Sequence, residues 1–403
     1  MLRLYSTITS KRTISMAQQI SQHLSMEGPG KFKLHGDLPD NAIDAHVHLG
    51  VYATINLWIG QLNLTGPGTF LENLREHIQE ILLHRSQLLS NFPSNLFQII
   101  KGIFNVAPLK TDLLGPGPEP VYLLTDFPAF FQYNKPAFIG LNTHSPLTII
   151  PQILSILKAF PNGLEQANRY NLLSYLETYK IKQAVVLPIA ISRFDQFSQA
   201  TLETCLGFKQ LPSFCSVHPD HPDLAGQFDH FKKMGACGFK FHADFQHTRP
   251  DSDKAHILFE HCLANKLIVQ CHVGWPTKHT GLSQAQFFEK AISYFKGLTF
   301  ILSHIGLAEF EETINLAKKY DNVFLETSGQ TAENIVKAGQ VIGADRILFG
   351  TDWPMYHPAV PISCVMDAFS SSDDSLEKVF SLNMNNILDQ ARKTTGTIDH
   401  GAF

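Results

Sequence analysis

Short apolar runs alternate with longer segments of helical period along most of this chain. The apolar runs have the length of buried strands, and the segments between them carry apolar residues three and four positions apart, as amphipathic helices do. The expected strands are Ala42–Leu49, Gln183–Ile189, Ser213–His218, Gly238–His242, Leu267–His272, Thr299–His304, Asn322–Thr327 and Arg346–Asp352. The expected helices include Lys254–Asn265, Gln284–Lys296, Leu307–Tyr320, Ala332–Ile342 and a closing helix at Asp374–Leu388.

This order of elements predicts the fold class. A strand followed by a helix, repeated along the chain, builds a parallel sheet with right-handed crossovers. Eight such strands favour an α/β protein with a closed (β/α)8 TIM barrel, and a doubly wound open sheet is the alternative. We expect the barrel at residues 41–392, between a partly disordered N-terminal tail at residues 1–40 and a C-terminal tail at residues 393–403.

A long insertion, residues 51–180, separates the first expected strand from the second. Phe70–Leu89 and Leu164–Tyr179 have helical period, so we expect the insertion to be mostly helical. It would either cover or border a site at the barrel mouth or form a layer that only buttresses the fold. Because it is rich in Phe and Leu, it also favours a homodimer.

Composition narrows the function classes. The chain has 403 residues, and 32 Lys and Arg against 36 Asp and Glu give a formal net charge of −4, without the basic stripe that nucleic acid requires. No apolar run approaches the roughly 20 residues that span a bilayer. The expected partner is therefore a small-molecule substrate rather than nucleic acid or a membrane.

The cysteines and the N-terminal segment bear on the compartment. Six cysteines without a C-x-x-C pair indicate reduced thiols and a cytoplasmic protein. Residues 1–26 contain Arg3, Lys11 and Arg12 and no acidic residue, a composition that resembles a transit peptide if the source is a eukaryote, which would make the protein mitochondrial. A disordered tail is the interpretation that we favour.

The first expected strand, within NAIDAHVHLG, ends in His46 and His48. Because side chains two positions apart on a strand share a face, Asp44, His46 and His48 are expected to line one side. Two imidazoles at one strand end are a common beginning of a metal site, although an H-x-H pair alone is weak evidence in a chain with 19 histidines.

Later strands end in matching groups. The fourth expected strand ends in Lys240 and His242, the fifth in His272, the sixth in His304 and the eighth in Asp352. A barrel places its catalytic groups at the C-terminal ends of its strands, so these side chains are expected to meet. The joint pattern predicts a metal site at that end.

The motifs that carry these residues resemble those of a known family. IDAHVHLG, GFKFHADFQ followed by RPDSDKAHILFEHC, VQCHVG, ILSHIG, VFLETSG and ILFGTDWP are similar, in that order, to the amidohydrolase-related branch of the amidohydrolase superfamily. The resemblance runs from Asn41 to about Leu388 and skips the insertion. It implies a metal-bearing (β/α)8 barrel, with ligands that map onto His46, His48, His272 and Asp352 and with His304 as a further ligand or an acid/base.

The expected ligands indicate which metal and which chemistry to expect. Three imidazoles and a carboxylate suit Zn²⁺ best and also accept Mn²⁺, Fe²⁺, Co²⁺ or Ni²⁺. An ion with a position open to water lowers the pKa of that water from about 15.7 towards 7. Asp352 could then take the proton from the water and later pass it to a leaving group.

Four other residues are expected to line the site. A lysine inside a barrel must be paired, neutral or modified. The resemblance implies that Lys240 is a carboxylated metal bridge or a cation for substrate, and half of a structural ion pair is the remaining interpretation. His242 is expected to line the pocket. Arg249 would bind a substrate carboxylate or form a surface salt bridge with Asp251 or Asp253, and Trp353 would shape the pocket wall or only pack a loop.

Together these features predict a metal-dependent hydrolase that acts on an ester, lactone or amide-like bond of a small organic molecule. Asp352 would act as base and then acid, and His304 or Lys240 would stabilise the developing oxyanion. The resemblance also implies an alternative, a metal-dependent non-oxidative decarboxylase of an aromatic or muconate-type acid, for which Lys240 or Arg249 would bind the substrate carboxylate.

Overall fold

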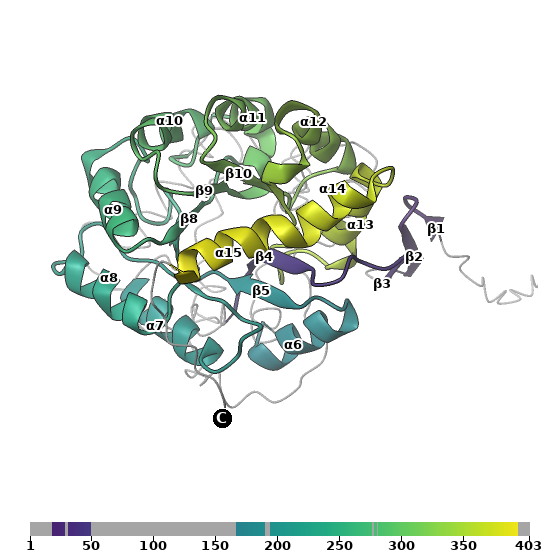
Figure 1. Ribbon diagram of the computed structural model, residues 1–403, viewed down its shortest axis with the longest axis horizontal. Helices are drawn as coiled ribbons and strands as arrows, with labels where there is room; N and C mark the ends of the chain where they lie inside the picture. Colours follow the sequence, from purple (N-terminus) through teal and green to yellow (C-terminus); the bar gives the residue numbers. More distant parts are fainter. Residues whose placement is uncertain are drawn as a thin grey trace, which may run out of the picture.

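The computed structural model describes residues 18–28, 31–49, 167–189, 194–275, 278–279 and 281–393. Figure 1 shows a central ring of strands with helices packed around its outside. The strands are β4 (Ile43–Val47), β5 (Gln183–Val186), β6 (Phe214–Cys215), β7 (Gly238–Phe241), β8 (Ile268–Cys271), β9 (Phe300–Leu302), β10 (Val323–Glu326) and β11 (Ile347–Leu348). Each lies within a predicted strand, which confirms the predicted order.

The eight strands are parallel and form a ring. Strands β6 to β11 make one sheet in chain order, and β4 pairs with β5. Single parallel bridges complete the circle: Val186 pairs with Ser213, and Val47 pairs with Trp353. At the second junction the His48 N–H donates to the Trp353 carbonyl at 2.8 Å, so the first and last strands are joined. The predicted (β/α)8 barrel is therefore confirmed.

Helices cover the outside of the ring. They are α6 (Arg169–Thr178), α7 (Phe194–Cys205), α8 (Leu224–Lys233), α9 (Asp253–Ala264), α10 (Ala285–Tyr294), α11 (Phe310–Lys319), α12 (Ala332–Ile342), α13 (Ala359–Ala368) and the short α14 (Asp373–Glu377). Several begin at a polar side chain that accepts a backbone N–H of the first turn, among them Asn168, Asp223, Ser252 and Thr331.

One predicted helix boundary is wrong. The helix expected from Leu307 begins at Phe310, because residues 304–307 have positive φ angles. Gly306, at φ +80°, lies so close to α11 that a Cβ atom there would overlap Thr313. The chain therefore makes a left-handed turn directly after β9, in the short element η2 (Ser303–Glu309).

Helix α15 (Asn383–Lys393) closes the N-terminal end of the barrel and crosses it in Figure 1. Its buried face packs on inward-facing side chains of the ring: Ile43, Ala45, Val185, Leu187, Phe214, Ile268, Ile301 and Leu348 meet Met384, Ile387, Leu388 and Ala391. Asn383 donates to the carbonyls of Ala344 and Ile347 at 2.7 and 2.8 Å, so its side chain has a structural role at the start of the helix. The C-terminal end of the ring, opposite α15, carries the candidate site.

Part of the expected N-terminal tail is folded. Strands β1 (Gln18–Gln19), β2 (Leu24–Gly28) and β3 (Lys31–Leu34) form an antiparallel sheet beside α13. His23 Nδ1 lies 2.6 Å from Asp367 of that helix, and the Phe32 ring contacts His357. Residues 18–28 and 31–34 therefore belong to the folded protein, and residues 1–17 lie outside the described residues.

Of the insertion, only its last part is described. Helix α6 packs on the barrel through Leu172 and Leu176, as the buttressing interpretation expects. The predicted helix Phe70–Leu89 and the rest of residues 51–166 lie outside the described residues.

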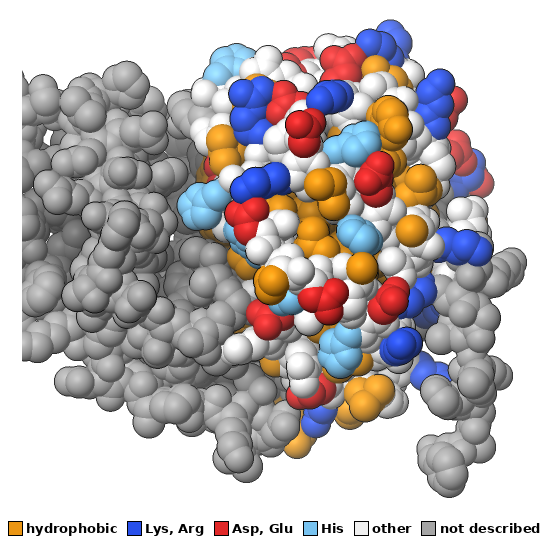
Figure 2. Space-filling view, turned by 90° about the vertical axis from the view of Figure 1, so that its left-hand side faces the viewer, with side chains coloured by type: hydrophobic (Ala, Val, Ile, Leu, Met, Phe, Trp, Pro, Cys, Tyr) orange, Lys and Arg blue, Asp and Glu red, His pale blue; other side chains and the backbone are white. Residues whose placement is uncertain are grey.

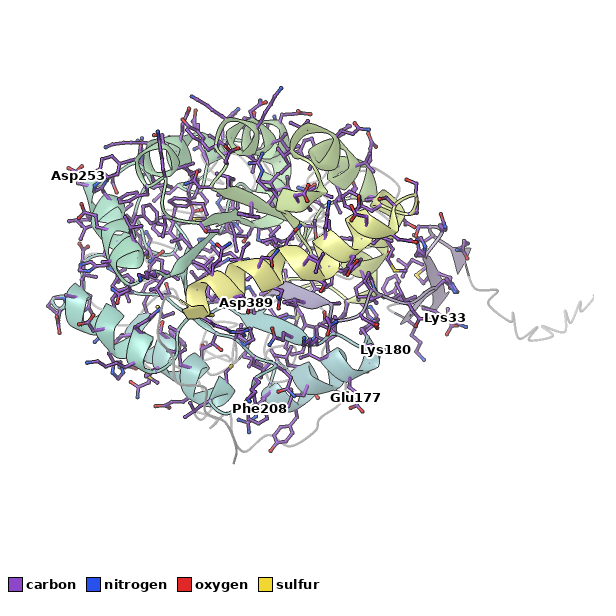
Figure 3. All side chains as sticks on the ribbon, in the orientation of Figure 1. Lys33, Glu177, Lys180, Phe208, Asp253 and Asp389 are labelled. Carbon is purple, nitrogen blue, oxygen red and sulfur yellow. The ribbon has the colours of Figure 1, made fainter. Side chains whose placement is uncertain are left out.

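The described surface carries mixed charge. Side chains of both signs alternate over the side seen in Figure 2, and charged groups such as Asp253, Glu177 and Lys180 lie on the outer rim in Figure 3. All six cysteines are free thiols, and burial raises the pKa of Cys237 to about 11. Among the described residues, no helix is long and apolar enough to cross a membrane.

Candidate metal centre

A bulge at the end of β4 aims both histidines of the first strand into the barrel. The pairing of β4 with β5 shifts register between Asp44 and Val47, so one extra residue enters the strand. The prediction that Asp44 shares a face with His46 and His48 is therefore wrong. Asp44 faces outward, where its carboxylate accepts a hydrogen bond from Tyr175 of α6 at 2.8 Å.

His46, His48 and Asp352 converge at the C-terminal end of the ring. The Nε2 atoms of His46 and His48 are 3.1 Å apart, and Oδ1 of Asp352 lies 3.4 Å from the first and 3.0 Å from the second. The three side chains are almost fully buried and form a group able to hold a metal ion. The structure thus brings together three of the four predicted ligands within one cluster.

The hydrogen-bond partners of the two histidines indicate that the three atoms facing one another are acceptors, as the ligands of a cation are. His48 Nδ1 faces the Leu187 carbonyl at 2.8 Å and must donate to it, and His46 Nδ1 faces Glu326 at 2.8 Å in the same way. A neutral imidazole that is protonated on Nδ1 carries its lone pair on Nε2, the atom that each of the two rings turns towards the other. Burial, followed by the Lys240 charge, holds the pKa of His46 well below its ordinary value, so that ring is neutral.

The third atom is also an acceptor. Burial opposes ionisation of Asp352, but positive charge on His46 and a hydrogen bond from His48 hold its pKa below the ordinary value. A cation held between the three residues would stabilise the carboxylate in the same way. Three acceptors that face one another without a proton repel unless a cation lies between them. Tetrahedral ligands about 2.0–2.1 Å from Zn²⁺ are about 3.3 Å apart, which matches the observed spacing of 3.0–3.4 Å.

His272 and His304 lie beside this cluster. His304 Nε2 is 3.2 Å from His272 Nδ1, and the ring centroids of His46 and His304 are 5.0 Å apart. The pKa values of both His272 and His304 are lowered, first by burial. That His272 is the fourth ligand stays a prediction.

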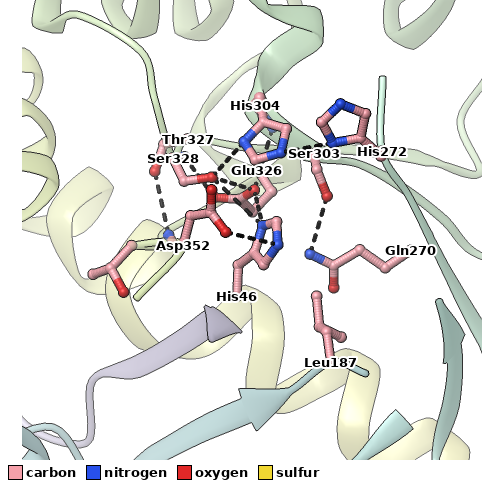
Figure 4. A network of polar contacts seen from close by, with 12 residues as sticks. His46, Leu187, Gln270, His272, Ser303, His304, Glu326, Thr327, Ser328 and Asp352 are labelled. Atoms are coloured by element: carbon pink, nitrogen blue, oxygen red, sulfur yellow. Dashed lines mark hydrogen bonds and ion pairs between the residues drawn. The ribbon is translucent and has the colours of Figure 1, made fainter. Parts of the chain in front are cut away.

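Glu326 is a central residue that the sequence reasoning missed. It is fully buried at the end of β10, and its carboxylate accepts hydrogen bonds from His46 Nδ1 at 2.8 Å, from the His304 backbone N–H at 3.2 Å and from Ser328 Oγ at 2.9 Å (Figure 4). A carboxylate bonded to the remote nitrogen of a ligand histidine fixes the ring and its proton. The sequence did contain a signal for Glu326. It lies at the end of the seventh expected strand, and the other site residues also lie at the ends of their strands.

Lys240 and His242 line the interior of the same region. Lys240 lies on β7 and His242 directly after it, two positions apart, and both side chains are buried. Neither Lys240 Nζ nor His242 Nδ1 has a hydrogen-bond partner among the described residues. Burial lowers the pKa of Lys240 to about 8, while Asp352 and Glu326 oppose that shift. The His242 ring is stacked between Phe245 and His272, with centroid distances of 3.8 and 4.2 Å.

Three further side chains, the candidates Arg249 and Trp353 and the strand-end residue His218, have local partners. Arg249 is half-exposed, pairs with Asp251 at 2.6 Å and lies over the Phe287 ring, as the surface-salt-bridge alternative expects. Trp353 is fully buried and stacks on Tyr175 of α6, as expected for loop packing. His218 accepts the Asp220 N–H at 3.2 Å, a turn role.

Comparisons with known proteins agree with this arrangement. Residues 193–384 match a family model described as amidohydrolase. A solved TIM-barrel protein from Bordetella bronchiseptica is similar in fold, with a TM-score of 0.50, 17% identity and coverage of 64% of this chain and 97% of that one. A dihydroxybenzoic acid decarboxylase from Polaromonas sp. JS666, solved with manganese and 2-nitroresorcinol, has a TM-score of 0.50 at 16% identity and covers 60% and 92% of the two chains. No curated protein sequence matches the chain.

Proposed function

Because the chain belongs to the amidohydrolase family through residues 193–384, we propose that it is a metal-dependent hydrolase of an ester, lactone or amide-like bond in a small organic substrate. The observation that most supports this proposal is the convergence of His46 Nε2, His48 Nε2 and Asp352 Oδ1, three buried acceptors spaced like the ligands of one ion.

These three residues would hold the ion, and His272 is proposed as the fourth ligand. The donor set suits Zn²⁺ best and accepts Mn²⁺, Fe²⁺, Co²⁺ or Ni²⁺. When bound, such an ion polarises a carbonyl group and makes water a nucleophile at neutral pH.

The protein side chains would handle the protons and the charge. Asp352 is ionised and would accept a proton from the attacking water and return it to the leaving group. Lys240, a buried amine in the field of the cluster, would stabilise the developing oxyanion, and His304 is the other candidate for that role.

Metal analysis of the purified full chain, followed by incubation with a panel of lactones, aryl esters and hydroxybenzoates, tests this proposal. Release of acid without CO₂ is expected. His48→Ala and Asp352→Asn should lose the metal, whereas His218→Ala removes a strand-end histidine outside the cluster and should retain it. Full metal retention in both ligand variants, or no turnover on any member of the panel, would contradict the proposal.

Decarboxylation is a second candidate, and Lys240 is the observation that favours it. A buried amine without a hydrogen-bond partner among the described residues suits a substrate carboxylate. A charged hydrogen bond contributes about 1.5–3 kcal/mol, so a carboxylate-binding role predicts that Lys240→Met raises KM for a carboxylate substrate by about 10- to 100-fold. The oxyanion role predicts instead a lower kcat for neutral esters with little change in their KM. Steady-state assays with both substrate types decide this; release of CO₂ without hydrolysis would identify the decarboxylase.

A further inference from the structure

Two acidic side chains hold the β8 loop, which joins β8 to α10. Asp244 reaches this loop from the segment after β7, and Glu309 reaches it from η2, after β9. The Gly274 N–H donates to the Ser283 carbonyl at 2.7 Å and so draws the two ends of the loop together. The loop is therefore fixed by its two neighbours around the ring.

Asp244 accepts hydrogen bonds from both ends of the β8 loop. Its Oδ2 accepts the indole N–H of Trp275 at 3.0 Å and the backbone N–H of Ser283 at 3.2 Å, and its Oδ1 accepts the backbone N–H of Leu282 at 2.6 Å. The Ser283 hydroxyl also donates to it. Indole and backbone N–H groups can only donate, so the directions of these bonds are fixed by the kind of group.

The backbone of the loop packs directly on the bond between Asp244 and Trp275. Gly281 has a φ of +70°, and a Cβ atom there would overlap both Asp244 Oδ1 and the indole nitrogen. On the other side of the loop, the buried Glu309 carboxylate accepts the backbone N–H of His279 at 2.9 Å and that of Ala285 at 2.7 Å. The indole is therefore held within a loop that is itself anchored.

Trp275 lies against the histidines that follow β7 and β8. Its ring centroid is 5.2 Å from that of His272 and 6.1 Å from that of His242, at interplanar angles of 60° and 55°. His272 in turn lies beside His304, whose ring is 5.0 Å from that of His46. The indole is half-buried, so part of its apolar surface is exposed at the C-terminal end of the barrel.

We propose that Trp275 is a specificity-determining residue whose indole contacts the apolar part of the substrate, and that Asp244 is the positioning residue that sets its orientation. An indole offers a large, rigid apolar surface, and the bond to Asp244 uses its polar edge and so fixes the direction of its faces. Substrates with a bulky apolar group beside the reacting bond should therefore bind better than small ones. The specificity role rests on the proposed function, whereas the positioning of Trp275 does not.

Indole ¹⁵N–¹H NMR of the metal-free full chain tests the positioning role. The chain contains three tryptophans, and Trp275→Phe and Trp353→Phe assign the two signals required. We expect the Trp275 indole proton to exchange with solvent about 10- to 100-fold faster in Asp244→Ala than in the wild-type protein, as for loss of a hydrogen bond to a charged acceptor. Trp353 is fully buried elsewhere in the core, so its exchange reports any general destabilisation.

Glu312→Gln is the matched control for the exchange measurement. Glu312 also binds the β8 loop and also carries one negative charge, but it does so through an exposed ion pair with Lys278 at 3.0 Å. Exposed pairs contribute little to stability, so the exchange of the Trp275 proton should stay at the wild-type rate in this variant.

Ligand binding tests the specificity role without turnover. The zinc-loaded full chain is titrated calorimetrically with acetate and with cyclohexanecarboxylate, two carboxylates with a small and a large apolar group. Burial of two or more CH₂ groups against the indole should make cyclohexanecarboxylate bind at least about 10-fold more tightly. Trp275→Ala should lose most of this preference, and Trp275→Phe, which keeps an apolar ring, should retain most of it.

The positioning role would be overturned by a Trp275 indole proton that exchanges in the wild-type protein as fast as in free tryptophan, or by unchanged exchange in Asp244→Ala. The wild-type rate decides this even if Asp244→Ala fails to fold, as judged by circular dichroism. The same affinity ratio of the two carboxylates in wild-type and Trp275→Ala proteins, or no binding of cyclohexanecarboxylate, would overturn the specificity role. Exchange and binding as expected, with no hydrolysis of any substrate, would sink the proposed function and leave the role of Trp275 standing.

Discussion

Asp44 shows how one buried side chain can hold two parts of the metal centre. Its carboxylate accepts the backbone N–H of His46 and that of Thr351, each at 3.0 Å, and the hydroxyl of Tyr175. Asp44 therefore links His46 on β4 to Thr351, the residue before Asp352, from the outer side of the barrel.

We expect Asp44→Ala to lower the free energy of unfolding by about 3 kcal/mol, because it leaves several buried donors unpaired and each costs about 1–3 kcal/mol. Asp44→Asn keeps a carbonyl acceptor and should cost only about 1 kcal/mol. Urea unfolding of the metal-free proteins measures both, with Asp389→Ala on the outer face of α15 as the control. Equal stability of Asp44→Ala and the wild-type protein would refute this role.

The clustering of the proposed ligands could be predicted from the sequence because they lie where strands end, and the fold brings strand ends together. His46, His48 and Asp352 were expected to meet for this reason, and they do. Glu326 was not, because a glutamate before Thr327 has no partner visible in the sequence. Its importance comes from His46 and His304, which reach it only in the folded barrel.

At the scale of single elements, the start of α13 carries a buried histidine. His357 accepts the Ala359 N–H at 3.2 Å and packs on Phe32 of β3. Burial lowers the pKa of His357 to about 4 from its ordinary 6.5. The unfolded chain therefore binds more protons than the folded protein between pH 6.5 and 4, so stability falls as pH decreases through that window.

We expect this residue to make the wild-type protein about 1–2 kcal/mol less stable at pH 5 than at pH 7, and His357→Asn to lose that contribution while keeping an acceptor for the helix. Urea unfolding at both pH values measures the difference. His221→Asn is the matched control, since His221 makes the same bond to the N–H two residues on, at the surface. An unchanged pH dependence in His357→Asn would be the contrary result.

The positions of the barrel elements were predictable because the apolar period is a local property of the chain, and each of the eight barrel strands lies within a predicted one. Two departures have physical causes that period does not encode. The bulge in β4 depends on pairing with β5, and the late start of α11 depends on the close contact between Gly306 and Thr313. Both departures lie beside site residues, where the backbone leaves regular strand or helix geometry and so places a site side chain.

For the molecule as a whole, the barrel depends on α15 to close its N-terminal end. Leu388 is fully buried among the inward-facing strand residues, so Leu388→Ala should destabilise the protein by about 2–5 kcal/mol. Leu382→Ala, at a position 40% exposed, should change stability by less than about 0.5 kcal/mol. Urea midpoints compare the two; similar losses in both would argue against α15 as part of the core.

Long-range packing also limited what the sequence could reveal about the N-terminal segment. Its short strands have no strong apolar pattern, and they are held by contacts with α13, such as the pair between His23 and Asp367. A segment of this kind looks like a tail until its distant partner is known. The barrel itself was easier to predict, because each strand–helix unit repeats the same local pattern.

Metal binding should raise the free energy of unfolding of the whole barrel, because the proposed ligands come from the first and last strands of the ring. His46 lies in β4 and His48 directly after it, Asp352 follows β11, and the two strands are joined by backbone hydrogen bonds such as that from Asp352 N–H to the His46 carbonyl at 2.8 Å. A ligand that binds only the folded state adds about 2.7 kcal/mol at 100 times its dissociation constant and about 1.4 kcal/mol for each further tenfold increase. We therefore expect the free energy of urea unfolding to rise with free zinc in the wild-type and His218→Ala proteins and to stay constant in Asp352→Asn. A zinc-independent wild-type protein would show that these residues do not form a metal centre that bridges the ends of the barrel.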